Sequence, residues 1–252
     1  MKKKVLFVVS SHGELGNTGK KTGYFLSEVT HPWSVLSAEY DIDVVSPKGG
    51  RPPVDGFDLS DPINRQYWDS PEWQDKMSTT MTPDQVNPSE YVAIFYAGGH
   101  GAMWDFPKNE KLAGIAQAIY EAGGIVAAVC HGPAGLLPIK LSTGEFLVKD
   151  RRVDSFTNAE EEANGTASVV PFLLQTALEK EGAIFDEAAP WTDHVVVDGR
   201  LITGQNPMSA LDVGKAIHNE LDSVAFKMQN FGQKVMDTIS DLKDQAENLT
   251  NG

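Results

Sequence analysis

The chain has 252 residues and a mass of 27.4 kDa, with 21 Lys and Arg against 35 Asp and Glu, which gives a net charge of −14. This length suits one large domain, and a hydrophobic fraction of 41% excludes disorder as the main state. The acidic balance argues against nucleic acid or an anionic membrane as a partner, because phosphate groups are bound by clusters of Lys and Arg. The single cysteine, Cys130, excludes an intrachain disulfide and fits a reducing compartment.

The first apolar run, Val5–Val9, follows three lysines and is shorter than the ~7–15 residues of a signal-peptide core. No stretch approaches the ~18 consecutive apolar residues of a membrane-spanning helix. We therefore expect a cytoplasmic protein that does not enter a membrane.

Short apolar runs along the chain predict buried strands of a parallel sheet, because each is rich in Val, Ile or Phe and ends at a small residue. They are Val5–Val9, Ile42–Val45, Tyr91–Ala97 and Gly124–Val129. Apolar residues at helical spacing predict helices over Thr22–Ala38 and Asn109–Ala122, and a later Asp198-Gly199 pair predicts the turn of a hairpin. Strands that alternate with helices predict a doubly wound α/β sandwich, with ligands at the carboxyl ends of the strands.

Two segments depart from this alternation. Gly49 to Pro88 is polar and rich in proline, yet it contains Tyr67, Trp68 and Trp73, which predicts a cap or lid. From Ser223 onward, apolar residues recur every three or four positions, which predicts an amphipathic helix that packs on its own domain or forms a dimer contact. We therefore divide the chain into a domain over 1–222, with the cap at about 49–88, and a helical extension over 223–252.

The segment Gly124–Leu137 carries the sharpest chemical signal. A buried strand leads directly into Cys130, with Ala128 two residues before it and Gly132 two residues after it. Small residues at these positions are typical of a nucleophile elbow, a tight strand-to-helix turn. The sulfur would lie at a helix N-terminus, where the helix dipole favours the thiolate, and the N–H of His131 would face a developing oxyanion. The alternative is that Cys130 is a small buried core residue.

Two further features lie where they could join this elbow. Gly98-Gly99 follows the Tyr91–Ala97 strand, so the N–H of Gly99 is a second candidate oxyanion donor and His100 is a candidate substrate-binding residue. Glu28 lies among apolar residues of the first predicted helix, so it could face inward, although an exposed glutamate is the default interpretation. A carboxyl buried beside the sulfur would keep its proton and could donate it.

These features together resemble the ThiJ/PfpI superfamily of class I glutamine amidotransferase-like enzymes, and within it the heat-shock-protein-31-like glyoxalase III branch. The resemblance runs from Lys4 to about Ile217 and implies a flavodoxin-like, mostly parallel sheet sandwiched by helices. The residues that carry it are Glu28 in a Glu-x-x-His-Pro sequence, Val45–Gly50, Ala97–Gly101, Ala127–Ala134, Pro190–Asp193 and Thr203–Pro207. The loop Ser10–Lys21 borders the predicted site without matching the family pattern, which makes it a candidate determinant of substrate choice.

By this resemblance Cys130 is the nucleophile, His131 its base and Glu28 the buried glutamate that contacts the sulfur. The acid that orients His131 would be Glu161 by its position in the motif, and the neighbouring Glu160 stays open. From the residues alone, this acidic run is typical of a solvated surface.

The implied activity is the glutathione-independent conversion of methylglyoxal and related 2-oxoaldehydes to 2-hydroxy acids, by a homodimer with no cofactor. The six histidines show no metal-ligand spacing, so we expect no metal. One alternative is a stress-response holdase chaperone or redox sensor with an oxidisable Cys130, and a weaker one is a cysteine peptidase or amidase.

Overall fold

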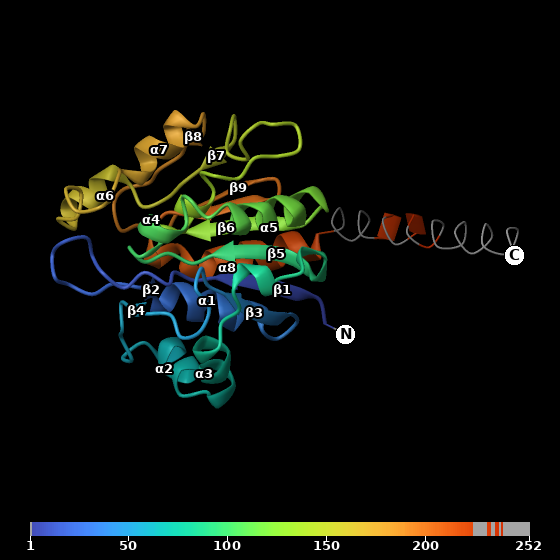
Figure 1. Ribbon diagram of the computed structural model, residues 1–252, viewed down its shortest axis with the longest axis horizontal. Coiled ribbons are helices and arrows are strands. Elements are labelled where there is room, and N and C mark those ends of the chain that lie inside the picture. The colour runs from blue at the N-terminus through green and yellow to red at the C-terminus, as the bar shows by residue number, and fades with distance from the viewer. Residues whose placement is uncertain (1, 224–230, 233–234, 237, 239–252) are drawn as a thin grey trace, which may run out of the picture.

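The computed structural model describes residues 2–223, 231–232, 235–236 and 238, and is built around a six-stranded sheet in the order β3-β1-β5-β6-β10-β9 (Figure 1). Its strands are β1 (Lys4–Val8), β3 (Asp41–Val45), β5 (Tyr91–Tyr96), β6 (Ile125–Val129), β9 (Val195–Asp198) and β10 (Leu201–Gly204). All neighbours are parallel except β9, which is antiparallel to β10. The parallel strands, numbered among themselves, follow the order 2-1-3-4-5, so the predicted flavodoxin-like fold is confirmed.

Helices cover both faces of the sheet (Figure 1). They are α1 (Leu26–Leu36), α2 (Pro62–Trp68), α3 (Pro71–Ser78), α4 (Ala102–Asp105), α5 (Glu110–Glu121), α6 (Asn158–Ala163), α7 (Leu174–Lys180) and α8 (Ala210–Asp222). Side chains alternate along each strand, so Val5 and Phe7 join the core under α1 and α8, while Leu6 and Val8 join the core under α5. Because helices cover both faces of the sheet, its central strands are continuous apolar runs, and this pattern is what made them predictable from the sequence.

The predicted helix over 22–38 begins later than expected, at Leu26. Tyr24–Phe25 instead form the short strand β2, which pairs with β4 (Val54–Asp55). Gly23 packs so tightly on the backbone of Pro53 that a Cβ atom there would clash, and the N–H of Tyr24 donates to the carbonyl of Pro53 at 3.0 Å. The other predicted helix is confirmed as α5, with Asn109 as its N-cap and Gly123 at a φ of 91° just beyond its end. The predicted hairpin is confirmed as β9 and β10.

The segment from Gly49 to Pro88 folds beside α1 (Figure 1). It contains β4, α2 and α3, and the side chains of Asp61 and Ser70 cap the two helices. Trp73 is buried and its ring meets that of Trp33 on α1, with 6.4 Å between centroids. These aromatic contacts explain why a polar, proline-rich segment has a defined structure, and its role as a cap stays a prediction.

Two remaining strands, β7 (Arg152–Val153) and β8 (Ile184–Phe185), pair with each other outside the main sheet. The predicted helix over 223–252 lies for the most part outside the described residues. Among the residues that the structure describes, no helix is long and apolar enough to cross a bilayer.

Candidate active site

Cys130 lies directly after β6 and adopts a φ of 59°, which is rare for a residue other than glycine. Its N–H donates to the carbonyl of Gly204 at 2.8 Å, and its carbonyl accepts from the N–H of Phe156 at 2.8 Å. Gly132 follows so close to the backbone of Tyr96 that a side chain would clash. The predicted elbow is therefore present, with a strained turn held from both sides.

The expectation of a dipole-stabilised thiolate was wrong. The residues after the elbow, Gly132–Gly135, form a single four-residue 3₁₀ turn, which is too short to provide the dipole of an α-helix. Burial raises the pKa of the Cys130 thiol well above its usual value, and a negative charge on Glu28 raises it further, while the N–H of Gly99 lowers it. The resting sulfur is a thiol that needs a base to ionise it.

His131 is placed to act as that base. Its Nδ1 lies 3.3 Å from the Cys130 sulfur, and its Nε2 lies 2.8 Å from Oε2 of Glu161. A carboxylate only accepts hydrogen bonds, so Nε2 carries the proton and the Nδ1 lone pair faces the thiol. Burial lowers the pKa of His131 to about 4, and the charge of His100 adds to this, against the opposing effect of Glu161. The imidazole is therefore neutral at pH 7 and free to accept a proton.

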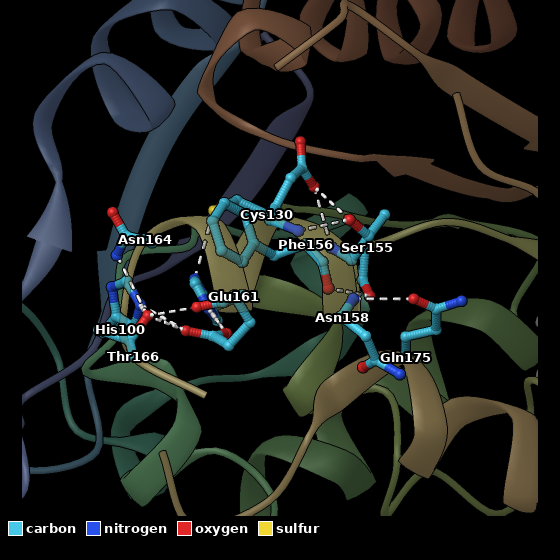
Figure 2. Close-up of polar contacts among 12 residues, drawn as sticks. His100, Cys130, Ser155, Phe156, Asn158, Glu161, Asn164, Thr166 and Gln175 are labelled. Carbon is cyan, nitrogen blue, oxygen red and sulfur yellow. Dashed lines mark hydrogen bonds and ion pairs between the residues drawn. The ribbon is translucent and has the colours of Figure 1, made fainter. Parts of the chain in front are cut away.

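Glu161, near the start of α6, orients both histidines (Figure 2). Its Oε1 accepts from Nε2 of His100 at 3.0 Å and from the hydroxyl of Thr166. Burial would raise the pKa of Glu161, but the hydrogen bonds from His100 and His131 outweigh it and hold the pKa well below its usual value. Glu161 is thus an ionised carboxylate behind the base.

The structure separates the two glutamates that the sequence left open. The carboxylate of Glu160 accepts from the N–H of Thr157 at 2.9 Å, from the N–H of Trp191 at 2.8 Å and from the amide of Asn206 at 2.8 Å. Glu160 makes no hydrogen bond with His131, whereas Glu161 does. Geometry therefore assigns the contact with His131 to Glu161, as the motif position favoured, and gives Glu160 a structural position.

Glu28 lies on α1 on the other side of the sulfur and is fully buried. Burial raises the pKa of Glu28 to about 8, although hydrogen bonding to the Cys130 thiol and to the N–H of Gly98 lowers it in part. A side chain on Gly98 would clash with the Glu28 carboxyl, so glycine is required there. Glu28 is therefore a neutral acid beside the thiol at pH 7, and the default expectation of an exposed glutamate was wrong.

The loop after β5 brings two more predicted residues to the site. Gly99 has a φ of 92° and packs against the backbone of Gly23, which only glycine allows. The ring of His100 lies over that of His131, with 4.1 Å between centroids. Gly99, His100 and His131 all border one cavity with Cys130. The role of the His131 N–H as an oxyanion donor stays a prediction.

This cavity has a volume of about 630 Å³ and lies at the carboxyl ends of the parallel strands, as expected for this fold. Asp55 and Asp61 contribute part of its wall from the 49–88 segment, and Lys20 and Lys21 contribute another part from the Ser10–Lys21 loop. Both segments that the sequence marked as unusual therefore border the site.

Three donor groups in the site, those of His100, His131 and Glu161, lie within 4.8 Å of one another and could hold a metal ion. The Nε2 atoms of both histidines are already engaged with the Glu161 carboxylate, so a metal would have to replace these hydrogen bonds. The arrangement fits a hydrogen-bonded relay, and the expectation of a site without metal stays a prediction.

Sequence reasoning missed the roles of Thr166, Phe156 and Trp191. Thr166 holds Glu161, Phe156 places its ring 4.5 Å from that of His131, and Trp191 borders the cavity. Trp191 belonged to a matched motif without a stated role, and nothing in the local sequence marks Thr166. Their positions depend on contacts between distant segments.

The fold and the site can now be compared with known proteins. The sequence model of the DJ-1/PfpI family matches residues 21–220. The chain belongs to this family. Its Cys130 elbow and Glu28 both fall within the matched region.

Several family members are similar over almost their full length. The glutathione-independent glyoxalase HSP31 of Saccharomyces cerevisiae is 35% identical over 227 residues, which cover 82% of this chain and 93% of that protein. The crystal structure of glyoxalase III from Candida albicans has a TM-score of 0.80 and 31% identity, covering 86% of this chain and 96% of that one. The structure of the 24 kDa Rapid Encystment Protein of Francisella tularensis has a TM-score of 0.85 and 39% identity, and the match covers 88% of this chain and 100% of that one.

Proposed function

We propose that this protein is a glutathione-independent glyoxalase that converts methylglyoxal and related 2-oxoaldehydes to 2-hydroxy acids with Cys130 as nucleophile. The observation that carries the proposal is the relay at the base of the cavity. Sγ of Cys130 faces Nδ1 of a neutral His131 at 3.3 Å, and Nε2 of His131 faces the ionised Glu161 at 2.8 Å. A relay of this kind can remove a thiol proton and return it later.

In the first step His131 takes the thiol proton, and the thiolate adds to the aldehyde carbon. This forms a hemithioacetal whose oxygen is placed near the N–H of Gly99. The oxygen receives the proton of Glu28, the neutral acid on the opposite side of the sulfur. Both proton transfers use groups whose protonation states at pH 7 already suit them.

In the second step the ionised Glu28 is the free base, because His131 still carries the thiol proton. Glu28 removes the proton from the former aldehyde carbon and returns it to the neighbouring carbon through an enediol. The product is a 2-hydroxy thioester on Cys130. Water then hydrolyses this thioester, which releases the 2-hydroxy acid and the free thiol. The sum is the addition of one water to the 2-oxoaldehyde, with no net oxidation or reduction and no need for a cofactor.

The relatives support this assignment from a second direction. HSP31 of S. cerevisiae and glyoxalase III of C. albicans carry this activity in their names, and each covers more than four fifths of this chain. Similarity over the whole domain supports the same reaction class, and the relay supplies the chemistry.

The test is lactate formation from methylglyoxal by the purified protein without glutathione, beside Cys130→Ala and Cys130→Ser. We expect turnover in the wild type and a loss of at least ~10³-fold in both variants. Cys130→Ser keeps the size of the side chain, so it controls for packing at the elbow. Wild-type turnover no higher than that of Cys130→Ala, with the thiol reduced and the protein folded, would reject the proposal. Holdase action that survives in Cys130→Ala would instead favour the chaperone alternative.

We also propose the homodimer and the cytoplasmic location that the family resemblance implies. The solution mass of the purified chain tests the first, and fractionation of the source cells tests the second.

A further inference from the structure

Trp191 stands out as a bulky residue with a strained backbone beside the reactive cysteine. Its φ is 63°, a conformation that L-residues with large side chains rarely adopt. Its side chain is 41% exposed and borders the same cavity as Cys130. Exposure and strain both oppose stability, so a tryptophan at this position needs another reason.

A buried carboxylate holds Trp191 in this conformation. Oε1 of Glu160 accepts its N–H at 2.8 Å, and the same oxygen accepts from Gln205 at 3.1 Å and from Asn206 at 2.8 Å. The amide of Asn206 also donates to the carbonyl of Thr192 at 2.8 Å, which fixes the residue after the tryptophan. The strain is therefore imposed by a fully buried polar network.

The same network also holds a second residue of the cavity lining. The side chain of Asn206 accepts the N–H of Met208 at 3.0 Å, and Met208 is 54% exposed and borders the cavity. Trp191 and Met208 are the two large apolar side chains of the described residues that are both exposed and part of the cavity lining. One polar cluster thus places an aromatic ring and a thioether in the lining of the cavity that contains the nucleophile.

The ring of Trp191 also continues an aromatic series that leads to the base. Its centroid lies 5.5 Å from that of Phe156, at an interplanar angle of 69°, and the Phe156 ring lies 4.5 Å from His131. An apolar group bound against Trp191 would therefore lie near Phe156, whose ring is next to that of the base. A three-carbon aldehyde fills only a small part of a cavity of about 630 Å³.

Resting on the proposed function, we propose that Trp191 and Met208 form a subsite for the substituent of the 2-oxoaldehyde. The subsite makes the protein select substrates with a bulky apolar or aromatic substituent over methylglyoxal. Trp191 is a specificity-determining residue, and Glu160 is the positioning residue that holds it.

The test compares initial rates with phenylglyoxal and methylglyoxal in the wild type, Trp191→Ala and Trp191→Gly. Glycine suits a positive φ, so Trp191→Gly removes the ring and relieves the strain at once, which protects folding. We expect the ratio of kcat/KM for phenylglyoxal to that for methylglyoxal to fall ~5- to 20-fold in both variants, because the ring contact is lost. The loss should be smaller with methylglyoxal than with phenylglyoxal, because a methyl group offers little surface to the ring.

Phe57→Ala is the matched control. Phe57 is 53% exposed and precedes a cavity residue, Asp58, but is not itself part of the cavity lining. We expect its removal to leave the ratio unchanged. An equal loss with both substrates in the Trp191 variants, or an unchanged ratio, would overturn the proposal.

A binding measurement separates this proposal from the proposed function. Mandelate and lactate are the 2-hydroxy acids that phenylglyoxal and methylglyoxal would give, and their binding by calorimetry needs no turnover. We expect mandelate to bind the wild type more tightly than lactate, and this preference to fall in Trp191→Gly and in Met208→Ala. A wild type without turnover that keeps the mandelate preference would reject the glyoxalase assignment and retain the subsite. Equal binding of the two acids would reject the subsite.

Discussion

On the α1 side of Cys130 the structure places Glu28, and on the α6 side it places Glu161 behind His131. Both carboxyls are buried, yet their surroundings differ. Glu28 has no hydrogen-bond partner of standard geometry for either oxygen among the described residues, and burial raises its pKa to about 8. Glu161 accepts from two histidines and from Thr166, and these hydrogen bonds hold its pKa low.

The difference shows how one residue type can serve as acid and as charged support around one sulfur. A buried carboxyl whose donors do not outweigh burial keeps its proton, and a buried carboxyl with several strong donors loses it. The neutral side can donate a proton to the substrate oxygen, while the charged side keeps His131 in the tautomer that accepts one. Burial raises the pKa of both carboxyls, and the hydrogen-bond donors around each one decide whether that rise is outweighed.

Removing the charge on the α6 side should have the largest effect. In Glu161→Gln the amide can no longer accept from both histidines, so His131 loses its fixed tautomer, and we expect kcat for methylglyoxal to fall ~10²- to 10³-fold. Glu162→Gln is the matched control, because it makes the same change at an exposed neighbour and should leave kcat within about 2-fold. A Glu161→Gln variant with nearly full activity would show that His131 does not depend on this carboxylate.

The contrast between the two sides was only partly predictable from the sequence. The elbow could be found because strand, Cys130 and small neighbours are contiguous, and the sheet could be found because buried parallel strands are uniform apolar runs. The flavodoxin-like order followed from the alternation of strands and helices together with the family resemblance.

The rest depends on contacts that local sequence does not encode. Glu160 and Glu161 are adjacent and chemically identical, and only their partners distinguish them. Glu160 accepts from the N–H of Trp191, and Glu161 contacts His131. The burial of Glu28 depends on Gly98, which is 70 positions away in the chain. Thr166 reaches Glu161 because the loop after α6 turns back on the helix.

The α1 side should control how stability depends on pH. The pKa of Glu28 is about 8 in the folded protein against an ordinary value of 4.5, so its protonated form favours folding. This contribution is fully present below about pH 4.5 and is lost as the pH rises through 8. We expect the free energy of unfolding of the wild type to fall relative to Glu28→Gln by ~2–5 kcal/mol between pH 5 and pH 9.

Urea unfolding at pH 5, 7 and 9 measures this difference, and groups that titrate in both proteins cancel. Glu72→Gln, an exposed change on α3, should keep a constant difference from the wild type within about 0.5 kcal/mol. A constant difference for Glu28→Gln as well would show that Glu28 is ionised in the folded protein, which would remove the acid from the proposed mechanism.

The smallest effect is expected where a buried carboxylate has the most donors. Glu160 accepts through one oxygen from Trp191, Gln205 and Asn206, and through the other from the N–H of Thr157. In Glu160→Gln the amide nitrogen must face at least one N–H donor in either orientation, so at least one buried hydrogen bond is lost and donors oppose each other. We expect the free energy of unfolding at pH 7 to fall by ~1–3 kcal/mol, measured in urea beside Glu162→Gln. An unchanged free energy of unfolding in Glu160→Gln would mean that the network does not need a carboxylate at this position. The functional difference between Glu160 and Glu161 would then depend only on the contact of Glu161 with His131.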